Sequence, residues 1–476
     1  MGKVKKILKV CGGYTSVKVL GEGSYGEVRK VTRNGVTLAA KISKLTEIGG
    51  REFFSSDIIK EIDLLTRLRH PNVISAVDGP YLSPDRICVF MDLLPIDLYD
   101  AMEKELSPTL KLEWTNKLWS GLAYLHANFV VHCDIKTANI MVNPTTSEIK
   151  IIDYGLAVNL PASRRVKLTS RIVSNWWRPP EIFGMMLAQA SGNRPLEYYF
   201  GTEVDVYSMG WVILELMAGI EPPRLHSDNP ENYYWYLLAM GMNPGPGFAV
   251  TNPPIKLSQK TNGVTINVKK INKTYLSKVI SAKAPKCFEK YLTLVAKAVT
   301  SAPLERPRAV DFLVDPTPIV ISYPRVDISY GKYYDKVTRF EAIKLLERIL
   351  YYYRLTIGET NIDSVLLEAI DLMDRIFSVR QFSDKDFLIG VATAASMTLC
   401  LYTWEGEAYS DVIMGILTKE QREIFFQTYS EIILALNGRL FRPTLDFGGE
   451  VTTKDALKIF KEALSPSDIK SYLNAV

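Results

Sequence analysis

Hydrophobic and polar residues alternate near the start of the chain. Between Val17 and Ile42, apolar side chains recur at about every second position on both sides of a glycine-rich loop. This period is typical of β-strands with one buried face. Asn34-Gly35 lies within the stretch, and an Asn-Gly pair favours a tight hairpin turn. The pattern therefore predicts a hairpin of half-buried strands.

A helical pattern follows this hairpin. Its apolar residues recur at the spacing of an α-helix, at Ile58, Ile62, Leu65 and Leu68. Ser-Ser-Asp at 55–57 can cap its start, and His70-Pro71 ends it. Glu61 neighbours the apolar stripe, where an unpaired carboxylate would be costly to desolvate. We therefore expect Lys41 as its cationic partner, although the segment alone would also fit a solvated glutamate on the helix edge.

The glycine-rich loop reads Gly21-x-Gly23-x-x-Gly26-x-Val28. Glycines in such a loop let backbone N–H groups approach an anionic ligand without obstruction by side chains. A flexible turn would explain the loop about as often. Two features favour a phosphate site: strands flank the loop on both sides, whereas a dinucleotide-binding fold would begin a helix there, and Lys41 follows on the far side of the hairpin.

An octapeptide, HCDIKTAN at residues 132–139, follows a predicted strand at 86–91 and a predicted helix at 110–128. Apolar stretches after it predict a strand–loop–strand hairpin. That region carries three oxygen-bearing side chains, Asp134, Asn139 and Asp153. Because Mg²⁺ prefers oxygen ligands together with phosphate oxygens, the region is a candidate magnesium site.

Together these motifs resemble the protein-kinase family. The glycine loop, lysine, helix glutamate, HxDxKxxN and DxG occur in the order of that family's signature. Trp177-Arg178-Pro179-Pro180-Glu181 is similar to the kinase Ala-Pro-Glu segment, with Pro179 in place of alanine. Asp205 resembles the aspartate that anchors the catalytic loop, and Arg306 resembles the partner of Glu181. Within the family, SSDIIKE, GEGSYGEV and NWWRPPE are most similar to the cyclin-dependent kinases.

The resemblance implies an ATP- and Mg²⁺-dependent protein serine/threonine kinase. Asp134 would orient and deprotonate the substrate hydroxyl, and Lys136 would steady the transferred phosphoryl group. Lys41, held by Glu61, would grip the α- and β-phosphates. The spacing of Lys136 after Asp134 resembles serine/threonine rather than tyrosine kinases.

The same resemblance assigns the ligand-binding residues. Asn139 and Asp153 would hold Mg²⁺. The glycine loop would cover the phosphates, residues 90–93 would form the hinge that meets adenine, and Asp97 would contact the ribose. The further nucleotide-binding candidates are Gly21, Glu22, Gly23, Gly26, Val28, Ala39, Phe90, Met91, Asp92, Leu93 and Asp97. Val173, Trp177 and Arg178 match the segment that selects proline after the target residue in relatives, so we expect Ser/Thr-Pro sites in protein substrates.

The resemblance also shows departures in the activation segment. Lys60, Cys133 and Val158 stand where typical cyclin-dependent kinases carry the arginines that gather its phosphate. One cation remains, and lysine lacks the bidentate fork of arginine. Thr169 aligns with the usual phosphosite, so we expect activity to depend little on its phosphorylation. Three nearby residues remain alternative receptors: Arg164, Arg165 and Arg171.

The second half of the chain has helical periodicity. Five amphipathic segments are joined by short polar stretches, at residues 339–355, 361–379, 383–405, 408–417 and 418–438. Thr418 and Gln421 form a capping box, and Gly438 is a stop signal. The third segment is apolar on nearly all sides, as expected for a central helix. We predict a compact all-helical domain.

This helical half resembles a cyclin box. The resemblance is carried by residues 372–378, by the helix at 391–405, and by Ile433-x-x-Leu436 with the following Leu440-x-x-Pro443-Thr444. The position at which the family carries a characteristic lysine, on the third helix, falls near Tyr402 in this sequence. Ile59 resembles the isoleucine that cyclins cover, which implies that the chain carries its activator in cis.

We therefore predict a multidomain α+β chain in which a bilobal kinase fold at 14–323 precedes an all-α cyclin-like domain. The lobes would comprise about 14–91 and 92–323, with a linker at 324–338 and the helical domain at 339–476. A tethered partner acts at roughly millimolar effective concentration, so we expect a monomer that needs no separate cyclin. Two alternatives stay open: a pseudokinase scaffold, and a kinase whose helical domain is only a docking module.

Composition adds little to this prediction. The 476 residues are 47% apolar and 23% charged, with a net charge of +5, which is an ordinary globular balance without the signature of a nucleic-acid partner. The five cysteines lie far apart, so neither a disulfide framework nor a zinc site is expected, and a reducing intracellular compartment, cytoplasm or nucleus, fits best. Hydroxyl residues interrupt the longest apolar run, at 387–402, so no membrane segment is expected. A fused kinase and cyclin would suit a virus-encoded enzyme.

Overall fold

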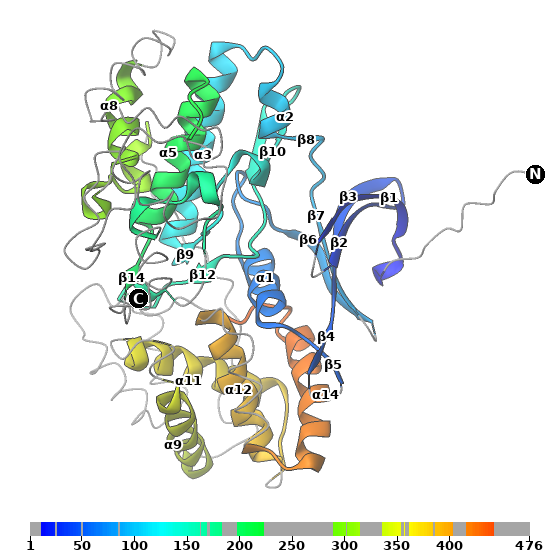
Figure 1. Cartoon of the computed structure of the whole chain (residues 1–476). Helices are drawn as coiled ribbons and strands as arrows, with labels where there is room; N and C mark the ends of the chain where they lie inside the picture. The colour runs from blue at the N-terminus through cyan, green and yellow to red at the C-terminus, as the bar shows by residue number, and fades with distance from the viewer. Residues whose placement is uncertain are drawn as a thin grey trace, which may run out of the picture.

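The computed structural model gives the arrangement of the chain in three consecutive regions (Figure 1). A sheet region comes first, a mostly helical second region follows, and a helical third region ends the described chain. The described residues are 11–23, 26–48, 51–83, 86–161, 163–168, 172–182, 198–222, 289–300, 302–314, 336–353, 357, 361–383, 386–402 and 416–441.

The first region is built on a five-stranded antiparallel sheet with the order β1-β2-β3-β7-β6. Its strands are β1 (Thr15–Gly23), β2 (Gly26–Arg33), β3 (Val36–Lys44), β6 (Ala76–Ser83) and β7 (Arg86–Met91). The predicted turn joins β2 to β3, with φ of 50° at Asn34 and 81° at Gly35. A short pair, β4 (Thr46–Ile48) and β5 (Arg51–Phe53), precedes the first helix. The predicted hairpin is confirmed.

The expected half-burial holds for the inner strands but is wrong for β1. On β2 and β3, Val31, Ala40 and Ile42 are buried. On β1, Val17 and Leu20 are 55% and 41% exposed. Among the described strands, β1 pairs only with β2, at the edge of the sheet, and Leu20 lines a cleft instead of a core.

Helix α1 (Ser56–Arg67) begins as the sequence predicts, because the Ser55 hydroxyl accepts the Ile58 N–H at 3.4 Å. The amphipathic pattern predicts one solvated face, but nearly every residue of α1 is buried. The first region covers one side of the helix, and α12 (Phe387–Tyr402) of the third region packs on another (Figure 1). The helix is therefore held between two regions that lie far apart in sequence.

The second region surrounds α3 (Pro108–Ala127), which packs against α5 (Glu203–Ala218). Helix α8 (Glu289–Ala298) lies on α5, and Trp119 stacks on Phe312 at 3.8 Å between ring centroids. Its shorter elements are β8 (Ile96–Asp97), α2 (Leu98–Met102), β9 (Val130–Val131), η2 (Thr137–Asn139), β10 (Ile140–Asn143), β11 (Glu148–Ile151), β12 (Val158–Asn159), β13 (Val166–Lys167), η3 (Asn175–Trp177), β14 (Tyr199–Phe200), η6 (Pro303–Glu305) and η7 (Ala309–Phe312). The predicted strand–loop–strand hairpin is present as β10 and β11.

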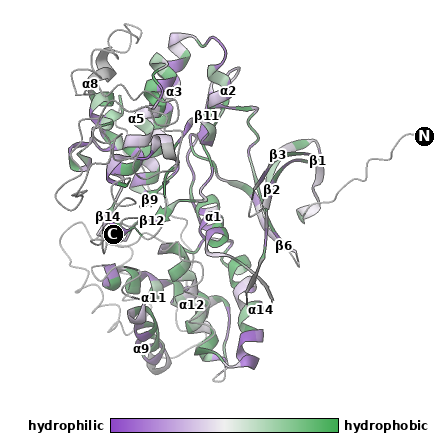
Figure 2. Ribbon diagram, in the orientation of Figure 1, coloured by the Kyte–Doolittle hydropathy of each residue, from purple (hydrophilic) through white to green (hydrophobic). Residues whose placement is uncertain are grey.

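The third region consists, in its described part, of α9 (Lys336–Tyr352), α11 (Ile362–Val379), α12 and α14 (Lys419–Ala435). These match the predicted segments except 408–417, which lies mostly outside the described residues. Helix α12 is buried from Ile389 to Tyr402 and contacts the other three, as expected for a central helix (Figure 2). The capping box at Thr418 and the stop at Gly438, with φ of 70°, are confirmed.

Two further expectations have different outcomes. The sequence predicted no disulfide framework, whereas Cys11 and Cys88 form a disulfide. The residues are 77 positions apart in sequence, and spacing alone does not show that β7 comes close to the segment before β1. No helix in the described segments is both long and apolar enough to cross a membrane. The predicted linker falls almost entirely outside the described residues.

Candidate active site

A cleft of about 940 Å³ lies between the five-stranded sheet and the second region. Most of the predicted nucleotide-binding residues line it: Gly21, Val28, Ala39, Lys41, Met91, Asp92, Leu93, Asp97, Asn139 and Asp153. A second cavity of about 430 Å³ shares Gly21, Val28 and Lys41 with the first and adds Glu22, Gly26 and Asp134. The two cavities therefore bring the glycine loop and the octapeptide to one place.

The glycine loop crosses the cleft as a hairpin, in which Gly23 pairs with Gly26. Gly26 has φ of 155°, and a Cβ atom there would overlap the backbone oxygen of Ile42 on the neighbouring strand. A side chain at this position would force β2 away from β3. Glycine is thus required by the close packing of the two strands.

Unlike the cleft residues named above, the predicted nucleotide-binding residue Phe90 does not face the cleft. It is fully buried on the other face of the sheet, where its ring stacks on Tyr14 at 4.0 Å between centroids. Side chains alternate along a strand, so Met91 faces the cleft while Phe90 cannot. Leu94, which the sequence prediction left out, lines the cleft together with Met91, Asp92 and Leu93.

Lys41 on β3 and Glu61 on α1 form the expected pair, in which Lys41 Nζ donates to Glu61 Oε1. Lys41 Nζ also lies 3.5 Å from Asp153 Oδ1. Burial opposes the charge of Lys41, but the carboxylates of Glu61 and Asp153 outweigh burial and raise the pKa of its amine. Burial would likewise raise the pKa of Asp153, but the charge of Lys41 overrides it and lowers that pKa. At neutral pH the cleft therefore presents an ammonium group beside an ionised carboxylate.

Asp134 is the centre of a second cluster. Its Oδ2 atom accepts Lys136 Nζ at 2.7 Å and Asn139 Nδ2 at 2.8 Å. Its Oδ1 atom accepts both the backbone N–H of Ser174, at 3.0 Å, and the Ser174 hydroxyl, at 2.6 Å. Lys136 Nζ also donates to Ser174 Oγ at 2.9 Å. The structure thus brings Asp134, Lys136 and Asn139 together and adds Ser174, which the sequence prediction missed.

Asp205 anchors the backbone of the octapeptide, as predicted. Asp205 Oδ2 accepts the His132 N–H at 2.7 Å, and Oδ1 accepts the Cys133 N–H at 2.9 Å. The predicted pair of Arg306 and Glu181 is also present, with two hydrogen bonds of 2.6 and 2.8 Å. These contacts fix both ends of the segment that carries Asp134 and Ser174.

Tyr154 has a structural role that the sequence did not reveal. Its side chain is fully buried, and its hydroxyl donates to the carbonyl of Ile74 at 2.8 Å. A phenylalanine at this position could not make this bond, because it has no hydroxyl. Tyr154 therefore ties the residues after β11 to the segment between α1 and β6.

The residues present fit a magnesium nucleotide. Asn139 Nδ2 donates to the Asp134 backbone carbonyl and carboxylate, which leaves Asn139 Oδ1 as an acceptor. Asp153 adds a carboxylate whose side chain is 44% exposed in the same cleft. An amide oxygen and a carboxylate are hard oxygen ligands of the kind that Mg²⁺ takes alongside phosphate oxygens.

The regulatory candidates lie on or near α1. Ile59 and Lys60 are buried, and Lys60 Nζ lies 3.3 Å from Asp57. Burial lowers the pKa of the Lys60 amine more than Asp57 raises it. Cys133 and Val158, at the other expected receptor positions, are fully buried. Thr169 lies outside the described residues.

Arg164 and Arg165, two of the three alternative phosphate receptors, contact other groups of the protein. Arg165 Nη1 donates to Glu203, and the Arg164 guanidinium lies 4.2 Å from the centroid of the Phe129 ring. Arg171 lies outside the described residues. Neither described arginine therefore replaces the missing ones near Lys60.

Comparison with known proteins agrees with this geometry. A family model for the protein kinase domain matches residues 14–241. Serine/threonine-protein kinase KIN28 of Saccharomyces cerevisiae is 30% identical over 228 residues, which cover 47% of this chain and 68% of the relative. The chain belongs to the protein kinase family. It is a protein serine/threonine kinase.

Other relatives of this kinase have cyclin-dependent or CTD kinase names. Cyclin-dependent kinase D-1 of Arabidopsis thaliana is 30% identical over 215 residues, covering 44% of this chain and 50% of the relative. CTD kinase subunit alpha of Saccharomyces cerevisiae is 30% identical over 206 residues, covering 43% of this chain and 36% of the relative. These relatives place the kinase region in the cyclin-dependent type.

The comparisons also limit two predictions. The family match ends at residue 241 and does not reach the third region, so the cyclin-like assignment stays a prediction. The relatives come from yeasts and a plant, so they do not support the virus-encoded source.

Proposed function

We propose that this chain is a proline-directed, cyclin-dependent-type kinase whose α1 helix is held in its catalytic position by the third region of the same chain. The observation that carries the proposal is the Lys41–Glu61 pair. It is formed by a helix that is buried between the cleft and α12. Phosphoryl transfer is mostly positioning and charge neutralisation, so a fixed Lys41 is central to it.

Each residue at the cleft has a role that its contacts support. Lys41, held by Glu61, grips the α- and β-phosphates. Asp153 and Asn139 hold the Mg²⁺ that would neutralise the developing charge on the phosphates. Asp134 accepts the proton of the substrate hydroxyl, and its contact with Lys136 places an ammonium group beside the site of transfer.

Proline selection is supported by the backbone at Val173. Val173 has φ of 64°, and its carbonyl accepts Arg178 Nε at 3.0 Å and Nη2 at 2.6 Å. That carbonyl is therefore already satisfied inside the protein. A substrate N–H facing it would lose its partner, which is costly, whereas proline has no N–H to satisfy.

A peptide pair tests the activity and this preference together. Purified chain with Mg²⁺ and ATP, and with no added protein, is expected to phosphorylate a Ser-Pro peptide about tenfold faster than its Ser-Ala counterpart, since one unsatisfied N–H costs about 1–3 kcal/mol. Radiolabelled phosphate transfer measures both kcat/KM values. Equal rates would refute proline selection, and no transfer to either peptide would refute the active kinase.

Activation in cis is supported by the packing of α1. Ile59 is fully buried, α12 packs against α1, and Gly438 lies against Ile62 and Thr66. The third region thus covers the helix that carries Glu61. The resemblance of this region to a cyclin box gives the cover a function, which is to keep Glu61 on Lys41. Because the cover is tethered, its effective concentration is roughly millimolar.

Weak dependence on phosphorylation is the second regulatory proposal. Lys60, Cys133 and Val158 are buried, and the end of α12 packs on β12, which contains Val158. A phosphate would meet few exposed cations there. We expect phosphatase treatment of the purified chain to change kcat less than about fivefold, because an exposed phosphate contact contributes about 1 kcal/mol or less. A loss of an order of magnitude after treatment would contradict this.

A further inference from the structure

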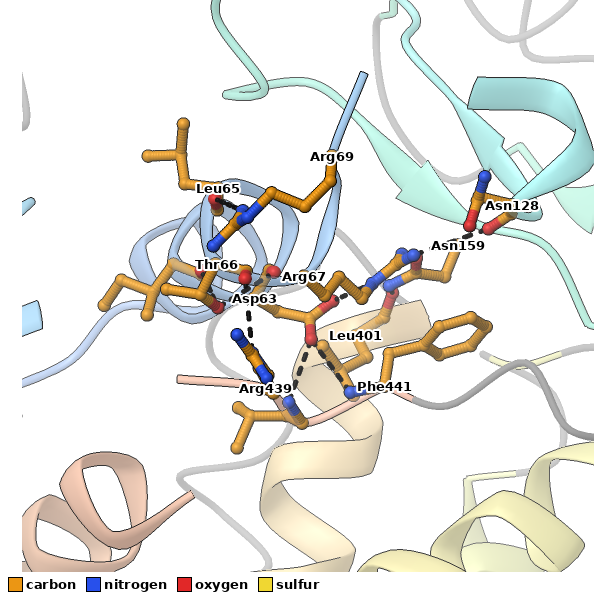
Figure 3. A network of polar contacts seen from close by, with 12 residues as sticks. Asp63, Leu65, Thr66, Arg67, Arg69, Asn128, Asn159, Leu401, Arg439 and Phe441 are labelled. Atoms are coloured by element: carbon orange, nitrogen blue, oxygen red, sulfur yellow. Dashed lines mark hydrogen bonds and ion pairs between the residues drawn. The ribbon is translucent and has the colours of Figure 1, made fainter. Parts of the chain in front are cut away.

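A short strip of the third region, residues 439–441, is bonded on two sides, and Figure 3 shows the side that faces Asp63. Asp63 of α1 accepts the backbone N–H groups of Leu440 and Phe441 with one oxygen, Oδ1, at 2.9 Å each. On the other side, Arg375 of α11 donates to the carbonyl of Arg439 at 2.9 Å and to that of Leu440. The strip therefore links α1 to α11 through its backbone.

The second oxygen of Asp63 continues the network. Asp63 Oδ2 accepts Arg67 Nε at 2.8 Å, and Arg67 Nη2 donates to Asn159 Oδ1 on β12. Asn159 Nδ2 then donates to the carbonyl of Leu401 on α12 at 3.3 Å. The Arg67 guanidinium also lies 4.6 Å from the centroid of the Phe441 ring. Figure 3 shows these groups converging where α1, β12 and the third region meet.

Burial makes the partners of Asp63 essential. The side chain of Asp63 is 0% exposed and that of Arg67 is 4% exposed. A buried carboxylate without its hydrogen-bond partners is strongly disfavoured. Asp63 takes two of those partners from residues 440 and 441, so it is satisfied only while the third region lies against α1. Any movement of α1 away from this strip breaks two charge-assisted hydrogen bonds at once.

We propose that Asp63, Arg67 and Asn159, named here the α1 clasp, position α1 for catalysis and tie the start of the activation segment to the third region. The inference rests on the proposed activation in cis and adds the residues that perform it. Glu61 lies on the same helix as Asp63, so the clasp holds Glu61 on Lys41. The sequence has no lysine near Tyr402, where the resemblance to cyclins would place one. In this chain Asp63 of α1 is the hydrogen-bond acceptor, and the backbone N–H groups of Leu440 and Phe441 in the third region are the donors.

A buried ion pair could also contribute stability alone, and the chain contains a matched control for that case. Arg339 and Asp374 form a pair between α9 and α11 with hydrogen bonds of 3.0 and 2.8 Å. The side chain of Asp374 is 0% exposed, like that of Asp63. The bonds between Arg339 and Asp374 join two helices of the third region, so the loss of Asp374 weakens that region and leaves the three clasp side chains in place.

The test compares Asp63→Asn with Asp374→Asn in the full chain. Asparagine keeps the size of the side chain but removes the charge and turns one acceptor into a donor. We expect Asp63→Asn to lower kcat for the Ser-Pro peptide about tenfold, as expected when about 1.4 kcal/mol of positioning energy is lost. We also expect faster hydrogen exchange in residues 56–67, with the five-stranded sheet unchanged. Asp374→Asn should keep both the kcat and the α1 exchange of the unmodified chain.

The outcomes decide between the proposals. Unchanged kcat and unchanged α1 exchange in Asp63→Asn would overturn the clasp. So would equal losses of kcat in the two variants, since stability alone would then explain them. If Asp63→Asn does not fold, Asn159→Ala replaces it, because it removes the link to Leu401 and leaves the 440–441 bonds intact. Its expected loss of kcat is about threefold, and an unmodified kcat would again overturn the clasp.

Failure of the clasp is distinguishable from failure of activation in cis. A steric substitution at Gly438 displaces α1 from the third region without altering any clasp side chain. If that substitution lowers kcat while Asp63→Asn does not, the clasp is wrong and activation in cis stands. If neither lowers kcat, activation in cis is itself wrong.

Discussion

Replacing Asp134 by asparagine is expected to lower kcat for a Ser-Pro peptide by about 10³-fold. A positioned general base contributes about 10²- to 10⁴-fold in rate, and Asp134 lies where Lys136, Asn139 and Ser174 converge. Asparagine keeps the shape and one acceptor oxygen, so the backbone N–H of Ser174 can still be satisfied. It cannot take the proton of the substrate hydroxyl. Steady-state transfer of labelled phosphate measures the loss.

The control for this substitution is Asp311→Asn. Asp311 also accepts hydrogen bonds from a basic residue, Arg308, at 2.8 Å, but it lies on η7 and does not line the cleft. It should retain the kcat of the unmodified chain. Both variants should keep their thermal stabilisation by Mg²⁺ and ATP, because Asp134 aims the hydroxyl. Turnover that survives in Asp134→Asn would refute its role, and an unmodified chain that binds ATP without transfer would favour the pseudokinase scaffold.

The catalytic cluster was predictable because its chemistry is encoded locally. Asp134, Lys136 and Asn139 lie within one short loop, so their spacing alone brings them together. The pairing of Lys41 with Glu61 follows from the high cost of leaving a carboxylate unpaired beside an apolar stripe. Both inferences need only short-range order and one physical rule.

Register and coverage were not predictable in the same way. Alternation predicts that Phe90 and Met91 face opposite sides of a strand, but it does not tell which side is the cleft, and the side chain of Phe90 lies on the other side. Asp63 and Arg67 lie outside the apolar stripe of α1, and nothing in the sequence pattern shows that they are buried. The structure buries them under Leu440 and Phe441, which follow Asp63 by 377 and 378 positions in the sequence. A hydrophobic pattern shows which face is apolar, but it cannot show what covers the polar one.

The docking-module alternative differs from activation in cis in a physical respect. A docking module needs an exposed surface for other proteins, whereas activation in cis needs buried contact with α1. The contacts of Asp63, Arg67 and Gly438 with their opposite partners are of the second kind. The decisive variable is therefore the position of α1, and a substitution that shifts only this contact tests it.

Gly438→Val is expected to lower kcat/KM by about 100-fold. A Cβ atom at Gly438 would lie 2.7 Å from Ile62 Cγ2 and 3.0 Å from Thr66 Cγ2, both on α1. A branched side chain there forces the helix and the third region apart, and such overpacking costs about 1–3 kcal/mol. Each 1.4 kcal/mol lost in positioning Glu61 is about tenfold in rate. Peptide phosphorylation measures the loss, and hydrogen exchange in residues 56–67 should rise with it.

The matched control is Gly219→Val at the end of α5. Gly219 has φ of 59°, close to the 70° of Gly438, but a Cβ atom there would meet nothing within 4 Å. Both variants therefore impose the same backbone strain on valine, and only Gly438→Val meets α1. Gly438→Ala should fall between the unmodified chain and Gly438→Val, since its side chain is smaller. Equal kcat/KM in Gly438→Val and Gly219→Val would show that the third region does not set the position of α1, and the docking-module alternative would then be correct.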